Sequence, residues 1–136
     1  MPRVLFVCVE NSNRSQMAEA FARAHGGVRV DAHSAGSRPS GRINPRAIAF
    51  MAERGIDLTM QHSKSLDEIG AEPFDAVVTM GCGDACPWIA ANRHEDWALP
   101  DPKLLDDTGF RCVRDEIEQR VVTLLGELGT ASRTSA

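Results

Sequence analysis

The sequence predicts a single α/β domain, a three-layer sandwich in which helices cover both faces of a four-stranded parallel sheet. Continuous apolar runs such as "RVLFVCV" (3–9) are typical of strands that are buried on both faces. These runs alternate along the chain with amphipathic helical segments, an order that makes successive strands parallel. At 136 residues, the chain can bury one core without disulfides.

The elements are predicted in order from apolar periodicity and from stop and cap residues. After the strand at 3–9, helices are predicted at 15–27, 44–56 and 110–128, further strands at 28–36 and 74–80, and a short edge strand with a turn at 99–103. Asn44 caps the second helix and Pro45 opens it. The domain therefore spans 1–129, and the polar tail at 130–136 is predicted to be disordered.

Composition excludes several classes of function. The net charge of −4 argues against a surface for nucleic acid or an anionic membrane, which would need clustered basic residues. The N-terminal apolar run is too short for a signal peptide or a membrane span, so we expect a cytoplasmic protein. We also expect it to be a monomer. In that reducing compartment, the four cysteines are expected to be reactive, metal-binding or packed rather than paired in structural disulfides.

A thiol stands where the first predicted strand meets the first helix, in "CVENSNRS" (8–15). In open α/β sheets, ligands bind at such strand ends. The backbone N–H groups after Cys8 can converge on an oxyanion, and Arg14 can complete the ring with its planar guanidinium. The predicted oxyanion-binding residues are Val9, Glu10, Asn11, Ser12, Asn13 and Arg14. The same positive potential stabilises the Cys8 thiolate, which makes Cys8 the predicted nucleophile.

This C-x5-R-S arrangement resembles the low-molecular-weight tyrosine phosphatase superfamily, and within it the arsenate reductases coupled to thioredoxin. "SQMAEAF", "SAG", "NPRAI" and the Asp-Pro pair at Asp101 follow in family order, so that the resemblance covers about residues 3 to 128. It implies the low-molecular-weight phosphatase fold. It also implies that Asp101 is the general acid and that Ser15 donates to the Cys8 thiolate.

The segment "GCGDACP" (81–87) favours a reductase over a phosphatase. A phosphatase needs no second thiol, whereas passing two electrons to arsenic requires another thiolate to attack Cys8. The predicted relay runs from Cys8 to Cys82 and then to Cys86, and thioredoxin reduces the final disulfide, so that no tightly bound cofactor is expected. The short C-x3-C spacing leaves the identity of the last resolving thiol open. The chain has no tyrosine and carries "KLLDD" after Asp101-Pro102, where phosphatases usually place aromatic residues.

Three other functions stay open. The same reductase could take its electrons from glutathione or mycothiol through a glutaredoxin-like partner. The chain could be a tyrosine phosphatase, an activity also expected as a weak side reaction of the reductase. It could also be a non-enzymatic module that binds arsenate, phosphate or sulfate and senses redox state.

No metal is predicted. Cys82 and Cys86 have no second cysteine or histidine pair at zinc spacing. The resemblance implies a weak potassium site near Asn11, Glu19 and Ser34, although Ser65 replaces a further acidic ligand. Elsewhere, Cys112 is expected to pack in the core on the inner face of the last helix, and Trp88 and Trp97 to pack in loops.

Overall fold

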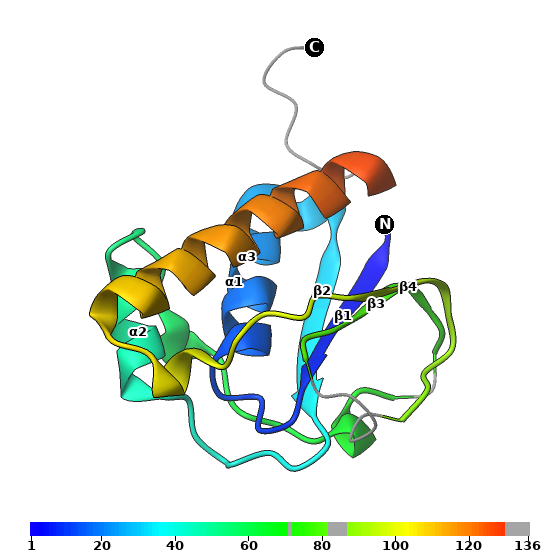
Figure 1. The fold of residues 1–136 in the computed structure, drawn as a ribbon. Coiled ribbons are helices and arrows are strands. Elements are labelled where there is room, and N and C mark those ends of the chain that lie inside the picture. The colour runs from blue at the N-terminus through cyan, green and yellow to red at the C-terminus, as the bar shows by residue number, and fades with distance from the viewer. Residues whose placement is uncertain (71, 82–86, 130–136) are drawn as a thin grey trace.

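The computed structural model describes residues 1–70, 72–81 and 87–129. Over these residues four parallel strands form one sheet in the order β2-β1-β3-β4 (Figure 1). The strands are β1 (Arg3–Cys8), β2 (Asp31–Gly36), β3 (Phe74–Thr79) and β4 (Ala91–Asp96). The predicted α/β class with one four-stranded parallel sheet is thereby confirmed. Because β2 and β3 lie on opposite sides of β1, the loop after Cys8 opens at the point where the strand order reverses, the usual ligand site of such sheets.

The fourth strand is not where the sequence predicted it. The segment "ANRHED" forms β4 at the edge of the sheet, whereas the predicted edge strand at 99–103 is a turn that leads into the short 3-10 helix η5 (Pro102–Leu104). Partly buried and exposed residues alternate along β4. An edge strand that pairs on one side needs no continuous apolar run, so the apolar signal that identified β1 and β3 is missing from β4.

The described part of the chain contains three α-helices, and the second and third begin at a side-chain cap. They are α1 (Arg14–Gly26), α2 (Pro45–Ala52) and α3 (Asp107–Leu128). The Asn44 side chain accepts from the N–H of Arg46, as expected of the predicted cap. The last helix begins three residues earlier than predicted, because Asp106 caps it by accepting from the N–H of Gly109.

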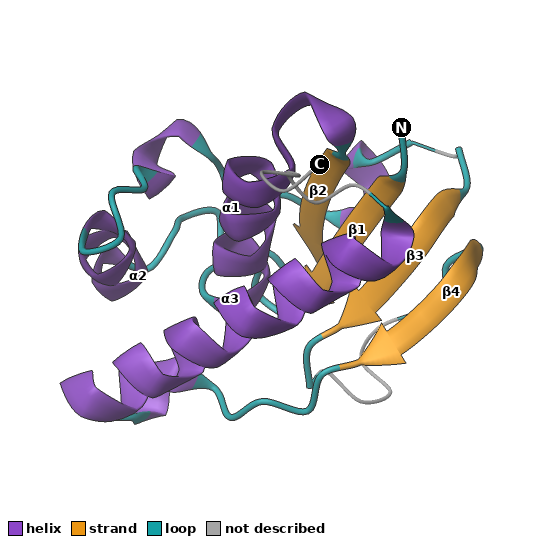
Figure 2. Cartoon of the chain, turned by 90° about the horizontal axis from the view of Figure 1, so that it is seen from above, coloured by secondary structure: helices purple, strands orange, loops and turns teal. Residues whose placement is uncertain are grey.

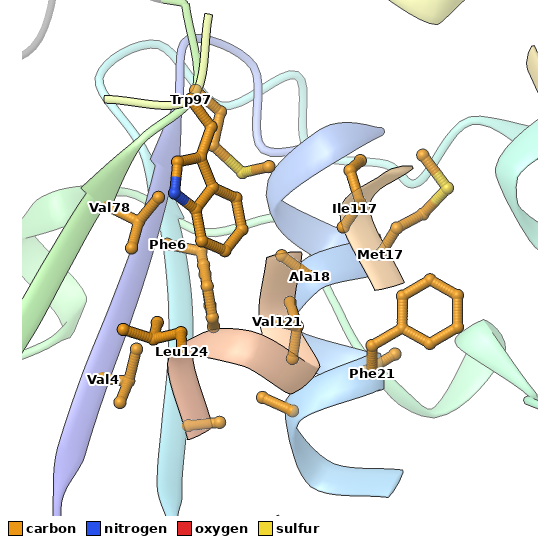
Figure 3. Packing of buried hydrophobic residues seen from close by; sticks show 14 of the residues in the cluster. Val4, Phe6, Met17, Ala18, Phe21, Val78, Trp97, Ile117, Val121 and Leu124 are labelled. Atoms are coloured by element: carbon orange, nitrogen blue, oxygen red, sulfur yellow. The ribbon is translucent and has the colours of Figure 1, made fainter. Parts of the chain in front are cut away.

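One face of the sheet carries the main core. Figure 2 shows α1 and α3 on the same side of the sheet, and Figure 3 shows their apolar side chains meeting those of β1 and β3. The buried side chains at the centre of this cluster are Phe6, Met17, Phe21, Val78, Trp97, Ile117, Val121 and Leu124. Trp97, which directly follows β4, therefore packs in the main core, while Trp88 is exposed and stacks on His94.

The opposite face of the sheet has a smaller apolar cluster. Its buried members are Leu5, Val7, Ala35, Phe74 and Val77. Leu66 in the 3-10 helix η3 (Leu66–Glu68), together with Ile69 and Ile89, packs against it. In the part of the chain that the structure describes, this face is thus covered by a 3-10 turn and adjoining loop residues, whereas the predicted three-layer sandwich placed helices on both faces.

The expectation that Cys112 packs in the core is wrong. Cys112 is exposed on α3, and the face that α3 buries runs from Phe110 through Val113 and Ile117 to Val121. Cys112 follows Phe110 by two residues, which turns its side chain to the far side of the helix. Arg114 is buried instead and donates to the carbonyl of Phe50 at 2.9 Å.

Within the described ranges, no helix is long and apolar enough to cross a membrane.

Candidate active site

The predicted nucleophile and its loop line one cavity. Cys8 is the last residue of β1, and the five residues after it join β1 to α1, which begins at Arg14. The cavity has a volume of about 260 Å³. Its lining residues are Cys8, Val9, Glu10, Ser12, Asn13, Arg14, Asp101 and Lys103. The structure therefore brings Asp101 to the loop from a distant part of the sequence, as the site prediction requires.

Several carbonyl groups of the loop are hydrogen-bonded to the chain outside the cavity. The Val9 carbonyl accepts from the N–H of Arg38 at 2.8 Å, and the Glu10 carbonyl from Ser40 at 3.0 Å. The Ser12 carbonyl accepts from the N–H of Asn44 at 3.1 Å. With its carbonyls satisfied in this way, the loop can present N–H groups to an oxyanion, in keeping with the predicted nest.

Two backbone positions allow the loop to curl. Asn11 has φ of 50°, the left-handed region that asparagine tolerates better than most residues. Gly36, at the end of β2, packs closely against the loop. A Cβ atom at this residue would lie 2.5 Å from the Val9 carbonyl oxygen. Glycine at residue 36 is therefore required by contact with the loop.

Ser15 links the Cys8 sulfur to Asn11. The Ser15 Oγ lies 2.8 Å from Cys8 Sγ and accepts from Asn11 Nδ2 at 2.8 Å. Asn11 Oδ1 accepts the backbone N–H of Lys64 at 2.9 Å, and this contact establishes which side of the Asn11 amide carries the N–H groups. Because Asn11 donates to Ser15, the hydroxyl hydrogen of Ser15 is free to point at the Cys8 sulfur. A thiolate at Cys8 would be stabilised by that donor.

The Arg14 guanidinium is held between two other segments. Its Nη1 donates to the carbonyl of Leu99 at 2.8 Å, which connects the oxyanion loop to the segment before Asp101. Gly81 lies against the same nitrogen, where a Cβ atom would stand 2.8 Å away. Gly81 directly precedes Cys82 in the sequence, so the described chain lies beside Arg14 at the residue before the second cysteine of the predicted relay.

Asp101 lines the cavity and also caps η5. Its Oδ1 accepts the N–H of Lys103 at 3.1 Å. The Lys103 Nζ lies 2.7 Å from Glu10 Oε2 and 3.9 Å from Asp101 Oδ2. The hydrogen bond to Glu10 raises the pKa of Lys103 above its ordinary value, so this ammonium stays charged at the rim of the cavity.

The role of Lys103 was not predicted from the sequence. Lys103 stands in the "KLLDD" segment, and the chain has only two lysines among its 15 basic residues. The second lysine, Lys64, was also missed, and it lies among the residues named for a potassium site. This scarcity of lysine was a signal that could have drawn attention to both.

The structure brings Asn11, Glu19 and Ser34 together, as the resemblance implied, but a side-chain ammonium joins them. Lys64 Nζ lies 3.3 Å from both Glu19 Oε1 and Ser34 Oγ. Ser65 lies outside this cluster and caps η3. No group of three or more histidine, cysteine, aspartate or glutamate side chains within 1–70, 72–81 and 87–129 could hold a metal ion.

Two predicted catalytic residues, Cys82 and Cys86, lie outside the described residues. The predicted tail at 130–136 also lies outside them.

Comparison with protein families identifies the fold of this site. The family model for low molecular weight phosphotyrosine protein phosphatase matches residues 3–134. The chain belongs to this family. The match covers the strand with Cys8, the oxyanion loop and Asp101, and it confirms the resemblance on which the sequence prediction rested.

Proteins that resemble the chain include named arsenate reductases. The chain is 40% identical over 131 residues to the glutaredoxin arsenate reductase of Synechocystis sp., and the match covers 94% of this chain and 99% of that protein. It is 38% identical over 128 residues to the arsenate reductase of Bacillus subtilis, covering 87% of this chain and 91% of that protein.

Solved structures of arsenate reductases agree with the fold. An arsenate reductase in the phosphate binding state superposes with a TM-score of 0.86 at 39% identity, covering 93% of this chain and 98% of that one. A thioredoxin-dependent arsenate reductase of Corynebacterium glutamicum superposes with a TM-score of 0.79 at 36% identity. That match covers 95% of this chain and 62% of the other.

Proposed function

We propose that this protein is an arsenate reductase, in which the Cys8 thiolate attacks arsenate and further cysteines supply the electrons. The observation that carries the proposal is the cavity itself. It joins one thiol, an oxyanion loop, Arg14 and a carboxylic acid in about 260 Å³, below the range of about 300–1,000 Å³ typical of small-molecule pockets. Such a site suits a small tetrahedral oxyanion.

The first step joins sulfur to arsenic. The Cys8 thiolate attacks the arsenic atom of arsenate, and one As–O bond breaks. Asp101 donates a proton to the departing oxygen, which leaves as water. The loop N–H groups and Arg14 hold the remaining arsenate oxygens, and Ser15 holds the sulfur before it attacks. The product is a covalent adduct between Cys8 and arsenic that is still in the +5 state.

The second step reduces arsenic. A thiolate at Cys82 attacks the Cys8 sulfur, the S–As bond breaks, and its electron pair stays on arsenic, which leaves as arsenite. Cys8 and Cys82 are then joined by a disulfide. Cys86 attacks Cys82 next, releases the Cys8 thiolate and leaves a Cys82–Cys86 disulfide. The position of Gly81 beside Arg14 supports this route, since Cys82 is the next residue.

A dithiol partner closes the cycle by reducing the last disulfide, and we propose thioredoxin for this role. The relatives differ in this respect, since the Synechocystis protein is named for glutaredoxin and the C. glutamicum structure for thioredoxin. Glutaredoxin with glutathione or mycothiol is therefore the second candidate. Because thiols supply both electrons, the proposed reaction needs no tightly bound cofactor, and a reducing cytoplasm would maintain it.

The rim of the cavity supports a reductase over a phosphotyrosine phosphatase. Of the described residues that line the cavity, none is aromatic, and Lys103 with Glu10 forms an ion pair at the rim. An aryl phosphate gains no ring contact there. We therefore expect weak hydrolysis of para-nitrophenyl phosphate as a side activity of the Cys8 loop.

One assay tests the proposal and separates the electron donors. Arsenite release and NADPH consumption are measured with thioredoxin and thioredoxin reductase, and in parallel with glutaredoxin, glutathione and glutathione reductase. Arsenite formation only in the thioredoxin mixture supports the full proposal. Formation only in the glutaredoxin mixture supports a reductase whose partner is glutaredoxin in place of thioredoxin. A protein that hydrolyses para-nitrophenyl phosphate but releases no arsenite with any donor, mycothiol included, is a phosphatase.

A further inference from the structure

We propose that the Lys64 ammonium is a built-in monovalent cation that positions the oxyanion loop and takes the place of a bound potassium ion. The Lys64 side chain is 12% exposed and the Glu19 side chain 2%. Lys64 Nζ lies 3.3 Å from each of three oxygens, which are Glu19 Oε1, Ser34 Oγ and the carbonyl of His62. An ammonium has three N–H donors, and this set provides one acceptor for each.

The backbone of Lys64 is anchored at both ends. Its N–H donates to Asn11 Oδ1 at 2.9 Å, and its carbonyl accepts the N–H of Gly36 at 2.9 Å. The segment therefore lies along both the oxyanion loop and the end of β2. With the backbone held there, the side chain reaches inward to Glu19 in place of extending into solvent.

The ammonium is connected to the nucleophile through a continuous series of hydrogen bonds. Ser34 Oγ donates to Glu19, and Asn11 Nδ2 donates both to Ser34 Oγ at 3.0 Å and to Ser15 Oγ at 2.8 Å. Ser15 in turn contacts Cys8. Lys64 thus acts through Glu19, Ser34 and Asn11, and it is a positioning residue.

Charge compensation explains why a cation is needed here. A buried carboxylate without a partner is strongly unfavourable. Arg23 reaches the outer oxygen of Glu19 at 2.7 Å from a side chain that is 55% exposed, which leaves the inner oxygen to Lys64. The inner site is an oxygen cage of the kind that suits hard cations, so a monovalent metal ion should occupy it once the ammonium is removed.

The donor set does not fit a potassium ion while Lys64 is present. Glu19 and Ser34 already contact the ammonium, and Asn11 turns its N–H group toward Ser34 and its carbonyl oxygen toward the Lys64 backbone. Wild-type protein should therefore respond no differently to potassium than to other salts of equal ionic strength.

The test compares wild type, Lys64→Met and Arg23→Met in potassium chloride, sodium chloride and choline chloride of equal ionic strength. Arg23→Met is the matched control, since it removes a cation from the same carboxylate but leaves the inner oxygen occupied. The first readout is the melting temperature. We expect potassium to raise it by roughly 3–6 °C over choline for Lys64→Met only, as specific binding to the folded state would.

The second readout is the affinity for inorganic phosphate, measured by protection of Cys8 from iodoacetamide. We expect Lys64→Met to bind phosphate about tenfold more weakly in choline chloride, a typical effect of removing a supporting contact. Potassium chloride should restore the affinity to within about twofold of wild type. A purely structural role for Lys64 would lower stability without restoration by one particular cation.

The inference rests on the proposed role of the Cys8 loop as an oxyanion site, but neither readout requires arsenate reduction. Failure to release arsenite would leave both measurements interpretable. A potassium-specific response of the wild-type protein would overturn the inference, as would a Lys64→Met protein that responds equally to all three salts. If Lys64→Met does not fold in choline chloride, Lys64→Gln is used in the same comparison, and recovery of folding by potassium alone supports the inference.

Discussion

Gly81 lies directly against the guanidinium of Arg14, and a Cβ atom at residue 81 would stand 2.8 Å from Arg14 Nη1. The contact joins the end of β3 to the start of α1, two segments far apart in the sequence. Gly81 has φ of 80°, and its N–H lies 3.4 Å from Asp96 Oδ1. The residue before Cys82 is thus placed beside the arginine that is proposed to hold the substrate.

Gly81→Ala should therefore disturb Arg14 as well as the local backbone. The added methyl group has to displace the guanidinium, so we expect weaker phosphate binding and slower arsenate turnover. The left-handed backbone alone should cost about 1–2 kcal/mol of unfolding free energy. Phosphate affinity is measured by calorimetry and stability by urea unfolding.

Gly70→Ala is the matched control, because Gly70 has φ of 79° and no atom of the other described residues lies within 4 Å of a built Cβ. It should lose similar stability and keep its phosphate affinity. Equal phosphate affinities in the two variants would refute a functional contact between Gly81 and Arg14.

Asn11 combines a strained backbone with a hydrogen-bonding side chain, and two substitutions separate them. Asn11→Gly keeps the left-handed conformation but removes the bonds to Ser15, Ser34 and the Lys64 N–H. We expect it to lose about 2–4 kcal/mol of stability, because buried partners are left unsatisfied. Asn11→Ala should lose about 1 kcal/mol more from its backbone. Urea unfolding of both variants measures the difference, and a fully stable Asn11→Gly protein would contradict this account.

Asp101→Asn tests the general acid without removing the cap of η5. An asparagine oxygen can still accept the Lys103 N–H, so the melting temperature should stay close to that of wild type. Loss of the proton donor should lower the rate of para-nitrophenyl phosphate hydrolysis by about 10²–10⁴-fold. Unchanged hydrolysis would leave Asp101 with its capping role alone.

The cysteines should separate into three classes of effect. Cys8→Ser should abolish arsenite release and para-nitrophenyl phosphate hydrolysis, because both begin with the same thiolate. Cys82→Ser should abolish arsenite release but retain slow hydrolysis of the aryl phosphate. Cys112→Ser is the control, since Cys112 is exposed on α3 and should affect neither. Thioredoxin-coupled reduction by Cys82→Ser would rule out the relay.

Glu53 should make the free energy of unfolding depend on pH in the acidic range. Hydrogen bonds from Arg111, and then from Arg114, lower the pKa of Glu53 from 4.5 to about 2. A carboxylate with a lowered folded-state pKa contributes stability that is fully present above 4.5 and is lost as the pH falls toward about 2. The difference in unfolding free energy between wild type and Glu53→Gln should shrink over this window. A difference independent of pH there would contradict the assignment, which NMR titration of the Glu53 carboxyl can check directly.

The oxyanion loop could be predicted because its parts are contiguous. Cys8, five loop residues and Arg14 follow one another, so strand, turn and helix signals place them together without knowledge of the distant chain. β1 and β3 were equally accessible, since strands buried on both faces consist of continuous apolar residues. β4 was missed because an edge strand lacks that signal, and Cys112 was misplaced because the rotation of α3 depends on what the helix packs against.

By itself, the sequence determined the fold class and placed Cys8 and its loop at the junction of a strand and a helix, because these depend on short-range order along the chain. Only the tertiary structure decided which distant groups complete the site. Lys64 meets Glu19 and Ser34, Lys103 meets Glu10, and Gly81 meets Arg14 across separations that no local pattern encodes. The carboxyl ends of the parallel strands all lie at the same end of the sheet. Glu19 is buried near this end, and because a buried carboxylate without a partner is unfavourable, the ammonium of Lys64 stabilises it there.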